Sequence, residues 1–277
     1  MASDLSDEIL ERALVGRFGR YRRVYDSIDS TNLEALRWAA EQDVAEGALV
    51  VADVQTEGRG RWGRRWLSAP GAALMFSIAL RPTSSPHAGL LTTAAGLAVA
   101  QAVERTSGLR TALKWPNDVL VNERKVSGVL VEARTVGHAT DAVVVGVGIN
   151  LHWRGADFPP EIAARATSIA QEVESAGRGR VPARADLLAA VLLDLEDCYD
   201  ELDTKRGRAE MIGRAAGRSA LLGREVSVRF ADGSSKQGIA AGLAEDGALL
   251  LDDGTVVVAG EIEQLGLRQG EGTRRDR

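Results

Sequence analysis

Runs of apolar residues divide the first 110 residues into strands and helices. Residues 21–28 alternate apolar and polar side chains, whereas residues 47–54 and 73–80 are continuous apolar runs, so all three segments are expected to be strands. Residues 30–42 place Leu33, Leu36 and Ala40 on one face, which predicts a helix. Ser30, Thr31 and Asn32 are capping residue types, and Thr31 with Glu34 predicts a capping box. The Ala-rich residues 87–108 predict a buried helix with Gly108 at its end.

The second half of the chain starts with strands, continues with helices and ends with short strands. Strands are expected at residues 111–115, 118–121, 125–134 and 141–151, with the turn "NERK" making a hairpin of the middle two. Residues 159–173 predict one helix that begins at Pro159–Pro160, and residues 185–202 predict an amphipathic helix. A short helix is also expected near residues 9–14.

The character of the chain changes near Gly217. Short strands follow, divided by Asp-Gly turns at residues 232, 246 and 253, which favours a small antiparallel barrel. We therefore expect a catalytic domain at residues 1–216, a barrel at 217–267 and a disordered tail at 268–277.

Composition narrows the class of protein. With 34 Lys and Arg against 39 Asp and Glu, the net charge of the 277 residues is -5, which argues against nucleic acid as a partner. One cysteine excludes an internal disulfide, and three scattered histidines have no metal-ligand spacing. The acidic N-terminus lacks the apolar region of a signal peptide, and no apolar run reaches membrane-spanning length, so we expect a soluble, cytoplasmic protein.

The stretch "GRGRWG", residues 58–63, matches the dinucleotide fingerprint letter by letter. That fingerprint needs a helix after the loop and an acid about 20 residues further on, and neither is present. A phosphate-binding P-loop motif is also absent from the sequence. Two interpretations remain: a solvated basic turn, or a clamp in which glycines let the backbone approach an anion that arginines bind. The clamp would be mobile when empty and ordered when filled.

Two further clusters carry polar residues at the ends of strands. "KWPND", residues 114–118, is followed by Lys125 and Gly128, and "VGVGIN", residues 145–150, places glycines late in a strand with Asn150 at its end. Packing alone explains a glycine in a strand as a bulge or a close contact, whereas a binding site explains it as room for a ligand. An exposed lysine after a hairpin turn is the ordinary interpretation of Lys125.

Together "STN", "QTEGRGRWGRRW", "KWPNDVLVNERKVSGVLVE" and "VGVGIN" resemble the catalytic core of biotin protein ligases, over residues 30–150 and more weakly through "ATSI" at 166–169. The resemblance implies an α+β fold of the class II synthetase-like biotin/lipoyl ligase type, with a mixed, largely antiparallel sheet, helices mainly on one face and a C-terminal SH3-like barrel. It also implies activation of biotin with ATP to biotinoyl-5′-AMP, then transfer to a lysine of a biotin carboxyl carrier domain.

The resemblance further implies roles for individual residues. Lys125, Arg59, Arg61 and Asp118 are the expected catalytic residues, with Lys125 bridging the biotin carboxylate and the α-phosphate. The expected biotin-binding residues are Ser30, Thr31, Asn32, Gln55, Gly58, Arg59, Gly60, Arg61, Lys125, Gly128, Leu130 and Gly146. The expected ATP-binding residues are Arg61, Arg64, Trp66, Lys114, Asn117, Asp118, Lys125 and Asn150. Mg²⁺ is expected with the ATP phosphates rather than in a protein metal site, and Trp62 has no assigned role.

Alternatives of the same fold are lipoate or octanoate ligases and transferases, of which the transferases use a reactive cysteine. Cys198 falls in the predicted helix 185–202 and is expected in the core. A non-catalytic biotin sensor would lack Lys125 or the arginines. Only about thirty residues precede "STN", too few for a DNA-binding domain, so a ligase without a repressor role is expected. A monomer or weak homodimer is expected.

Overall fold

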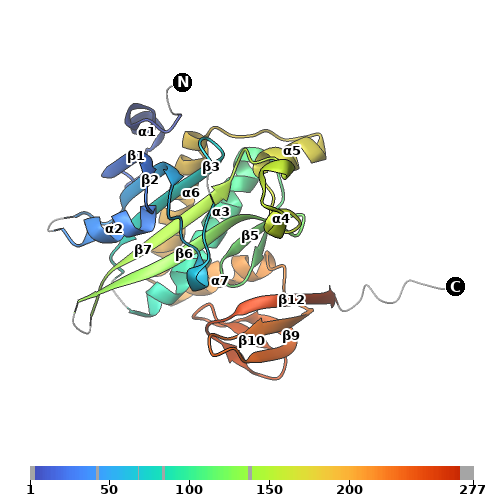
Figure 1. The fold of residues 1–277 in the computed structure, drawn as a ribbon. Helices are drawn as coiled ribbons and strands as arrows, with labels where there is room; N and C mark the ends of the chain where they lie inside the picture. The colour runs from blue at the N-terminus through green and yellow to red at the C-terminus, as the bar shows by residue number, and fades with distance from the viewer. Residues whose placement is uncertain (1–3, 42–43, 68, 83–84, 137–138, 269–277) are drawn as a thin grey trace.

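A seven-stranded mixed sheet forms the body of the protein (Figure 1). The computed structural model describes residues 4–41, 44–67, 69–82, 85–136 and 139–268. The strand order is β1-β2-β3-β7-β6-β5-β4, and every neighbouring pair is antiparallel except β1 and β2. The strands are β1 (Arg22–Ile28), β2 (Ala48–Gln55), β3 (Ala73–Leu80), β4 (Ala112–Lys114), β5 (Asp118–Val121), β6 (Arg124–Val136) and β7 (Ala139–Asn150).

Most helices cover one face of this sheet. Leu49 and Val51 of β2, for example, join the large apolar core on the side of α3 and α6, whereas Ala48 and Val50 contribute to a smaller cluster with α2 on the other side. This confirms the expected α+β fold. The helices are α1 (Asp7–Ala13), α2 (Thr31–Ala39), α3 (Ser85–Ser107), α4 (Pro160–Ala163), α5 (Ile169–Ala176), α6 (Arg184–Glu201) and α7 (Lys205–Gly217).

A second, five-stranded antiparallel sheet follows α7 and lies beside the lower edge of the body in Figure 1. Its order is β11-β10-β9-β8-β12, and the predicted turns are present: Gly233, Gly247 and Gly254 all have positive φ, which glycine adopts without steric cost. The strands are β8 (Arg224–Arg229), β9 (Ser235–Leu243), β10 (Leu249–Leu251), β11 (Val256–Val257) and β12 (Glu261–Arg268). The domain boundary at residue 217 stays a prediction, and residues 269–277 of the predicted tail lie outside the described residues.

Two local expectations were wrong. Ser30 caps α2 without a side-chain hydrogen bond, and Glu34 accepts hydrogen bonds from Arg23 and Tyr25 of β1 instead of closing a box with Thr31. The single helix expected at residues 159–173 is divided into α4 and α5.

The division of that helix has a tertiary cause. Residues 165–167 leave the helical path to form a short parallel bridge with Lys125, and Ser168 then caps α5 by accepting from the Gln171 amide. Helix α7 was not predicted, because its apolar residues are sparse.

Candidate active site

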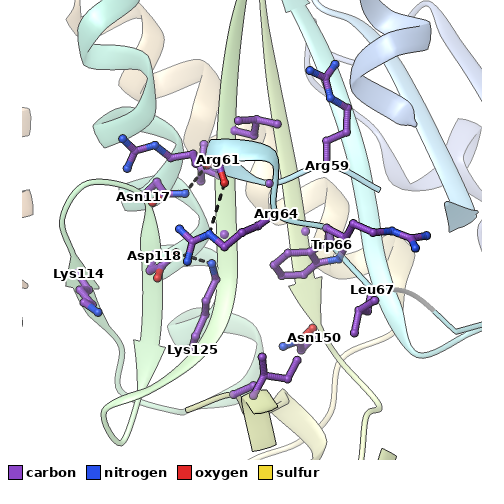
Figure 2. Close-up of a pocket in the computed structure, with 18 of the residues that line it drawn as sticks. Arg59, Arg61, Arg64, Trp66, Leu67, Lys114, Asn117, Asp118, Lys125 and Asn150 are labelled. Carbon is purple, nitrogen blue, oxygen red and sulfur yellow. Dashed lines mark hydrogen bonds and ion pairs between the residues drawn. The ribbon is translucent and has the colours of Figure 1, made fainter. Parts of the chain in front are cut away.

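A cavity of about 1190 Å³ opens on the sheet face opposite α3 and α6 (Figure 2). The Gly-Arg loop, the β5–β6 hairpin, the segment after β7 and the second sheet all contribute to its wall. Of the site residues expected from the sequence, the wall contains Ser30, Thr31, Asn32, Gln55, Arg59, Gly60, Arg61, Arg64, Trp66, Lys114, Asn117, Asp118, Lys125, Gly128, Leu130, Gly146 and Asn150.

One end of the cavity is a closed hydrogen-bond network of amides and hydroxyls, which also includes the Glu132 carboxylate. Gln55 Oε1 accepts from the Thr31 backbone N–H at 2.8 Å, and Asn32 Nδ2 donates to the Glu132 carboxylate at 2.8 Å. Ser77, fully buried on β3, donates to Asn32 Oδ1 at 2.6 Å and lies 2.8 Å from Thr31 Oγ1. These contacts fix the directions in which the amides and hydroxyls face a ligand.

Glycines on β6 and β7 make room for the larger side chains of the site. A Cβ atom at Gly146 would lie 1.8 Å from Asn32 Oδ1, and one at Gly148 would lie 2.4 Å from the Trp66 ring. A Cβ atom at Gly128 would lie 2.9 Å from Lys125 Nζ. The glycines therefore provide space for protein groups that reach into the cavity, rather than forming bulges.

The Gly-Arg loop is a closed turn and not the start of a helix. Its base is sealed because the Trp66 amide donates to Gly58 O at 2.9 Å, and its tip is one turn of 3₁₀ helix, Arg61–Gly63, in which Trp62 has a φ of 58°. Gly58 lies at this base, where a Cβ atom would meet Trp66 O at 2.4 Å, and it is not among the described residues that line the cavity. Its expected contact with biotin therefore finds no support in the cavity wall.

The loop arginines point to different parts of the molecule. Arg59 pairs with Glu132 at 3.0 Å, which places it beside Asn32 rather than beside Lys125, so its catalytic role stays a prediction (Figure 2). Arg64 pairs with Glu261 of the second sheet. Arg61 is half-buried, and this burial lowers the pKa of its guanidinium from the ordinary value, although nearby Glu261 acts in the opposite direction.

A cluster of charged groups forms the opposite end of the cavity. Lys125 Nζ lies 2.5 Å from Asp118 Oδ1 and 5.6 Å from the centre of the Trp66 ring (Figure 2). Burial lowers the pKa of Lys114, which Asp118 partly offsets. The indole N–H of Trp66 is buried without a hydrogen-bond partner among the described residues. These groups form a positively charged region that suits a phosphate or carboxylate.

The second sheet also reaches this cavity, which the sequence did not reveal. Arg229, Glu261 and Glu263 line it, and the Arg229 guanidinium lies 5.2 Å from the centre of the Trp62 ring. Trp62 thus contacts the second sheet. Arg229 and Glu261 carry no local signal because they lie more than 100 residues after the loop. Ser77 was missed because it reads as one more position in a buried strand.

Several kinds of chemistry find no support in the described residues. Within them, no group of three or more His, Cys, Asp or Glu side chains is arranged to hold a metal ion. None of the helices in the described part of the chain has the length and hydropathy needed to cross a membrane. Cys198 is 1% exposed, and burial raises the pKa of its thiol to about 12, so it is a core residue and not an activated nucleophile.

Comparison with known proteins identifies the family to which a chain with this cavity belongs. Residues 24–150 match the biotin/lipoate A/B protein ligase family, and residues 221–263 match the biotin protein ligase C-terminal domain. A biotin–[acetyl-CoA-carboxylase] ligase of Mycobacterium tuberculosis is 33% identical over 272 residues, covering 94% of this chain and 96% of that ligase. The chain belongs to the biotin protein ligase family.

Other members of the biotin protein ligase family agree in fold and sequence. A structure of biotin protein ligase from Aquifex aeolicus in complex with biotin and ATP has a TM-score of 0.73 and 33% identity, covering 88% of this chain and 97% of that one. The bifunctional ligase/repressor BirA of Bacillus spizizenii is 33% identical over 233 residues, which are 83% of this chain and 69% of that protein. The match of the C-terminal domain confirms that the second sheet is part of the ligase architecture.

Proposed function

We propose that the protein joins biotin to a carrier protein in two steps. The biotin carboxylate attacks the α-phosphorus of ATP, forming biotinoyl-5′-AMP and releasing pyrophosphate. An amine of a carrier lysine then attacks the carbonyl carbon of this mixed anhydride, loses a proton, and AMP leaves. The homologues named biotin–[acetyl-CoA-carboxylase] ligase support the carboxyl carrier domain of an acyl-CoA carboxylase as the acceptor.

The position of Lys125 is the observation that carries this proposal. It stands in one cavity whose two ends differ: neutral amides and hydroxyls at one end, and Arg61, Lys114 and Asp118 at the other. Biotin has a neutral ureido ring and an anionic carboxylate, so its ring fits the first end and its carboxylate reaches Lys125. The ammonium group would lower the repulsion between this carboxylate and the α-phosphate and stabilise the charge that develops between them.

The remaining charged groups fit ATP. Arg61, Arg64 and Lys114 are placed to bind its phosphates, and Trp66 has a buried indole N–H ready to donate. Mg²⁺ would arrive with the triphosphate as part of the substrate. Asp118 contacts Lys125, so holding this lysine in place is its first role, and proton transfer from the carrier lysine is a second role that we assign to it.

A polar ring site distinguishes biotin from lipoate. The dithiolane ring of lipoate has no hydrogen-bonding group, so it would gain no hydrogen bond from Thr31, Asn32 or Gln55, which line this end of the cavity, whereas the ureido group of biotin can both donate to and accept from such groups. Octanoyl transfer through a cysteine is excluded for Cys198 by its burial. We further infer a cytoplasmic location, which the requirement for ATP favours, and a monomer or weak homodimer that does not use nucleic acid as a partner.

The test is transfer of labelled biotin to a purified carboxyl carrier domain, with ATP and Mg²⁺, in the presence of excess lipoate. Biotin alone should label the carrier. Lys125→Met should retain the biotin binding that the ring end provides but lose about a hundredfold to a thousandfold in adenylate formation, because one preorganised charge contact in a transition state has about this effect. Equal labelling by lipoate would overturn the assignment of the acyl group. Biotin binding without AMP formation by the wild-type protein would make it a sensor rather than an enzyme.

A further inference from the structure

Glu172, on α5, is buried and is not among the described residues that line the cavity. Its side chain is 1% exposed, yet two segments converge on it, the β5–β6 turn and residues 165–167. Asn122 Nδ2 donates to it at 2.6 Å, the Arg124 guanidinium at 2.5 Å and the Thr167 hydroxyl at 2.6 Å. A buried charge with all its partners in place resists displacement, because the loss of any one partner leaves the others unsatisfied.

Two of the groups bound by Glu172 lie just before Lys125 in the chain. Asn122 and Glu123, with φ values of 49° and 62°, form the tight turn of the β5–β6 hairpin, and Arg124 directly precedes Lys125. Glu172 therefore holds both the turn and the first residue of β6. The hairpin cannot tilt about its turn while these contacts remain.

The second segment held by Glu172 fixes the backbone of Lys125 itself. The Lys125 amide donates to Arg165 O at 2.8 Å, and the Thr167 amide donates to Lys125 O at 2.9 Å. The Thr167 side chain binds Glu172. The carboxylate thus closes a ring that runs from Arg124 through Lys125 and Thr167 and back to α5.

We propose that Glu172 is a positioning residue for the reaction of Lys125: its carboxylate locks the hairpin turn to residues 165–167 and so sets where the lysine ammonium stands in the cavity. This inference rests on the proposed function. Lys125 acts between two reacting groups, so a displacement of its backbone reduces transition-state stabilisation more than it reduces binding of biotin, whose ring end is held by α2, β2 and β3.

Glu172→Gln tests the inference, because the amide keeps the volume and removes the charge. We expect kcat for adenylate formation, measured by pyrophosphate exchange, to fall about tenfold or more. The dissociation constant of biotin should change by less than about twofold. Arg124→Gln removes the other partner of the ion pair, and the Arg124 side chain is 30% exposed whereas that of Glu172 is buried. This variant should also lower kcat without changing the binding of biotin.

Glu104→Gln is the matched control. Glu104 likewise receives an arginine, a threonine hydroxyl and one further N–H, from Arg218 at 3.1 Å and from Thr111 at 2.9 and 3.2 Å, but it belongs to α3 on the other face of the sheet. Because its side chain is 30% exposed, Glu104→Gln should lower the melting temperature less than Glu172→Gln does, and it should leave kcat within about twofold of wild type.

Two results would overturn the positioning role: an unchanged kcat in Glu172→Gln, or equal losses of kcat in the Glu172 and Glu104 variants. If Glu172→Gln does not fold, Arg124→Gln decides in the same way. Wild-type protein that binds biotin but forms no adenylate would instead overturn the proposed function, which separates the two failures.

Discussion

Lys114 lies in a partly buried position that disfavours its protonated, charged form. Burial and the neighbouring cations Lys125 and Arg165 lower its pKa below the ordinary 10.5, against the opposing effect of Asp118 and Glu261. The phosphates of ATP would favour the protonated form and raise this pKa on binding. A group whose pKa rises on binding contributes fully to the complex below its pKa in the free protein. The contribution declines as pH rises above that lowered pKa and is lost once pH exceeds the raised pKa of the complex.

We therefore predict that the KM for ATP rises with alkaline pH, below the pH at which an ordinary lysine titrates. Lys114→Arg should flatten this rise, because a guanidinium stays protonated throughout the range from about pH 7 to about pH 10. The measurement is the KM for ATP of both proteins across this range, with the KM for biotin as the internal reference. A wild-type profile as flat as that of the arginine variant would contradict the prediction.

The sequence predicted the site residues that belong to short motifs, but it did not predict those that only the fold brings together. Ser30 to Asn32, the Gly-Arg loop and Lys125 could be recognised because each belongs to a short motif, and all of these residues except Gly58 and Gly63 lie in the cavity wall. Ser77 and Glu132 could not, because their partners Asn32 and Arg59 lie 45 and 73 residues away in sequence and only the sheet brings them together. The hydrogen bonds that Glu172 accepts from Asn122, Arg124 and Thr167 could not be predicted from the sequence either.

At the level of elements, contacts between the tip of the Gly-Arg loop and the second sheet hold the loop against that sheet. The Trp62 ring lies under the guanidinium of Arg229, which also pairs with Glu261 at 3.2 Å, and Glu261 in turn binds Arg64. The loop is thus attached to β8 and β12 of the second sheet. A loop that closes over an adenylate protects it from water, so the strength of this attachment should set how fast the intermediate escapes.

Trp62→Ala should therefore increase release of AMP in the absence of carrier about twofold to fivefold, since an exposed cation–π contact contributes about 0.5–1 kcal/mol. Arg229→Ala should have at least this effect, because it also removes the ion pairs with Glu261 and Glu263, and the double variant should be no worse than Arg229→Ala because the contact with Trp62 is already lost in it. The assay is carrier-independent AMP production after adenylate has formed. Additive effects in the double variant would show that the two residues act separately.

Strands were predictable from the sequence and the irregular segment 164–168 was not. The apolar runs of β2, β3 and β7 have the length and composition of strands that are buried on both faces. The helical pattern at residues 159–173 is also sound locally, but hydrogen bonds between residues 165–167 and Lys125 oppose it. Tertiary contacts decided this element, and they did so beside the proposed catalytic lysine.

Across the whole molecule, Trp115 joins the two sheets. It follows Lys114 and precedes the Asp118 strand, yet its ring belongs to the apolar core of the second sheet with Leu249 and Val228. Its indole N–H donates to Gly247 O at 3.1 Å, in a turn that packs against α3. The two sheets therefore share one structural residue at the charged end of the cavity, and a loosened junction should disturb Lys114 and Asp118 before it disturbs the polar end.

Trp115→Phe should raise the KM for ATP roughly fivefold and leave the dissociation constant of biotin almost unchanged, because it removes one buried hydrogen bond, of about 1 kcal/mol, at the junction. Leu249→Ala is the control: it makes a cavity in the same core, at about 2–5 kcal/mol of unfolding free energy, without touching the ATP end. Steady-state kinetics with both substrates and thermal unfolding would separate the two effects. If Leu249→Ala raised the KM for ATP as much as Trp115→Phe, the second sheet would act through its overall stability and not through this junction.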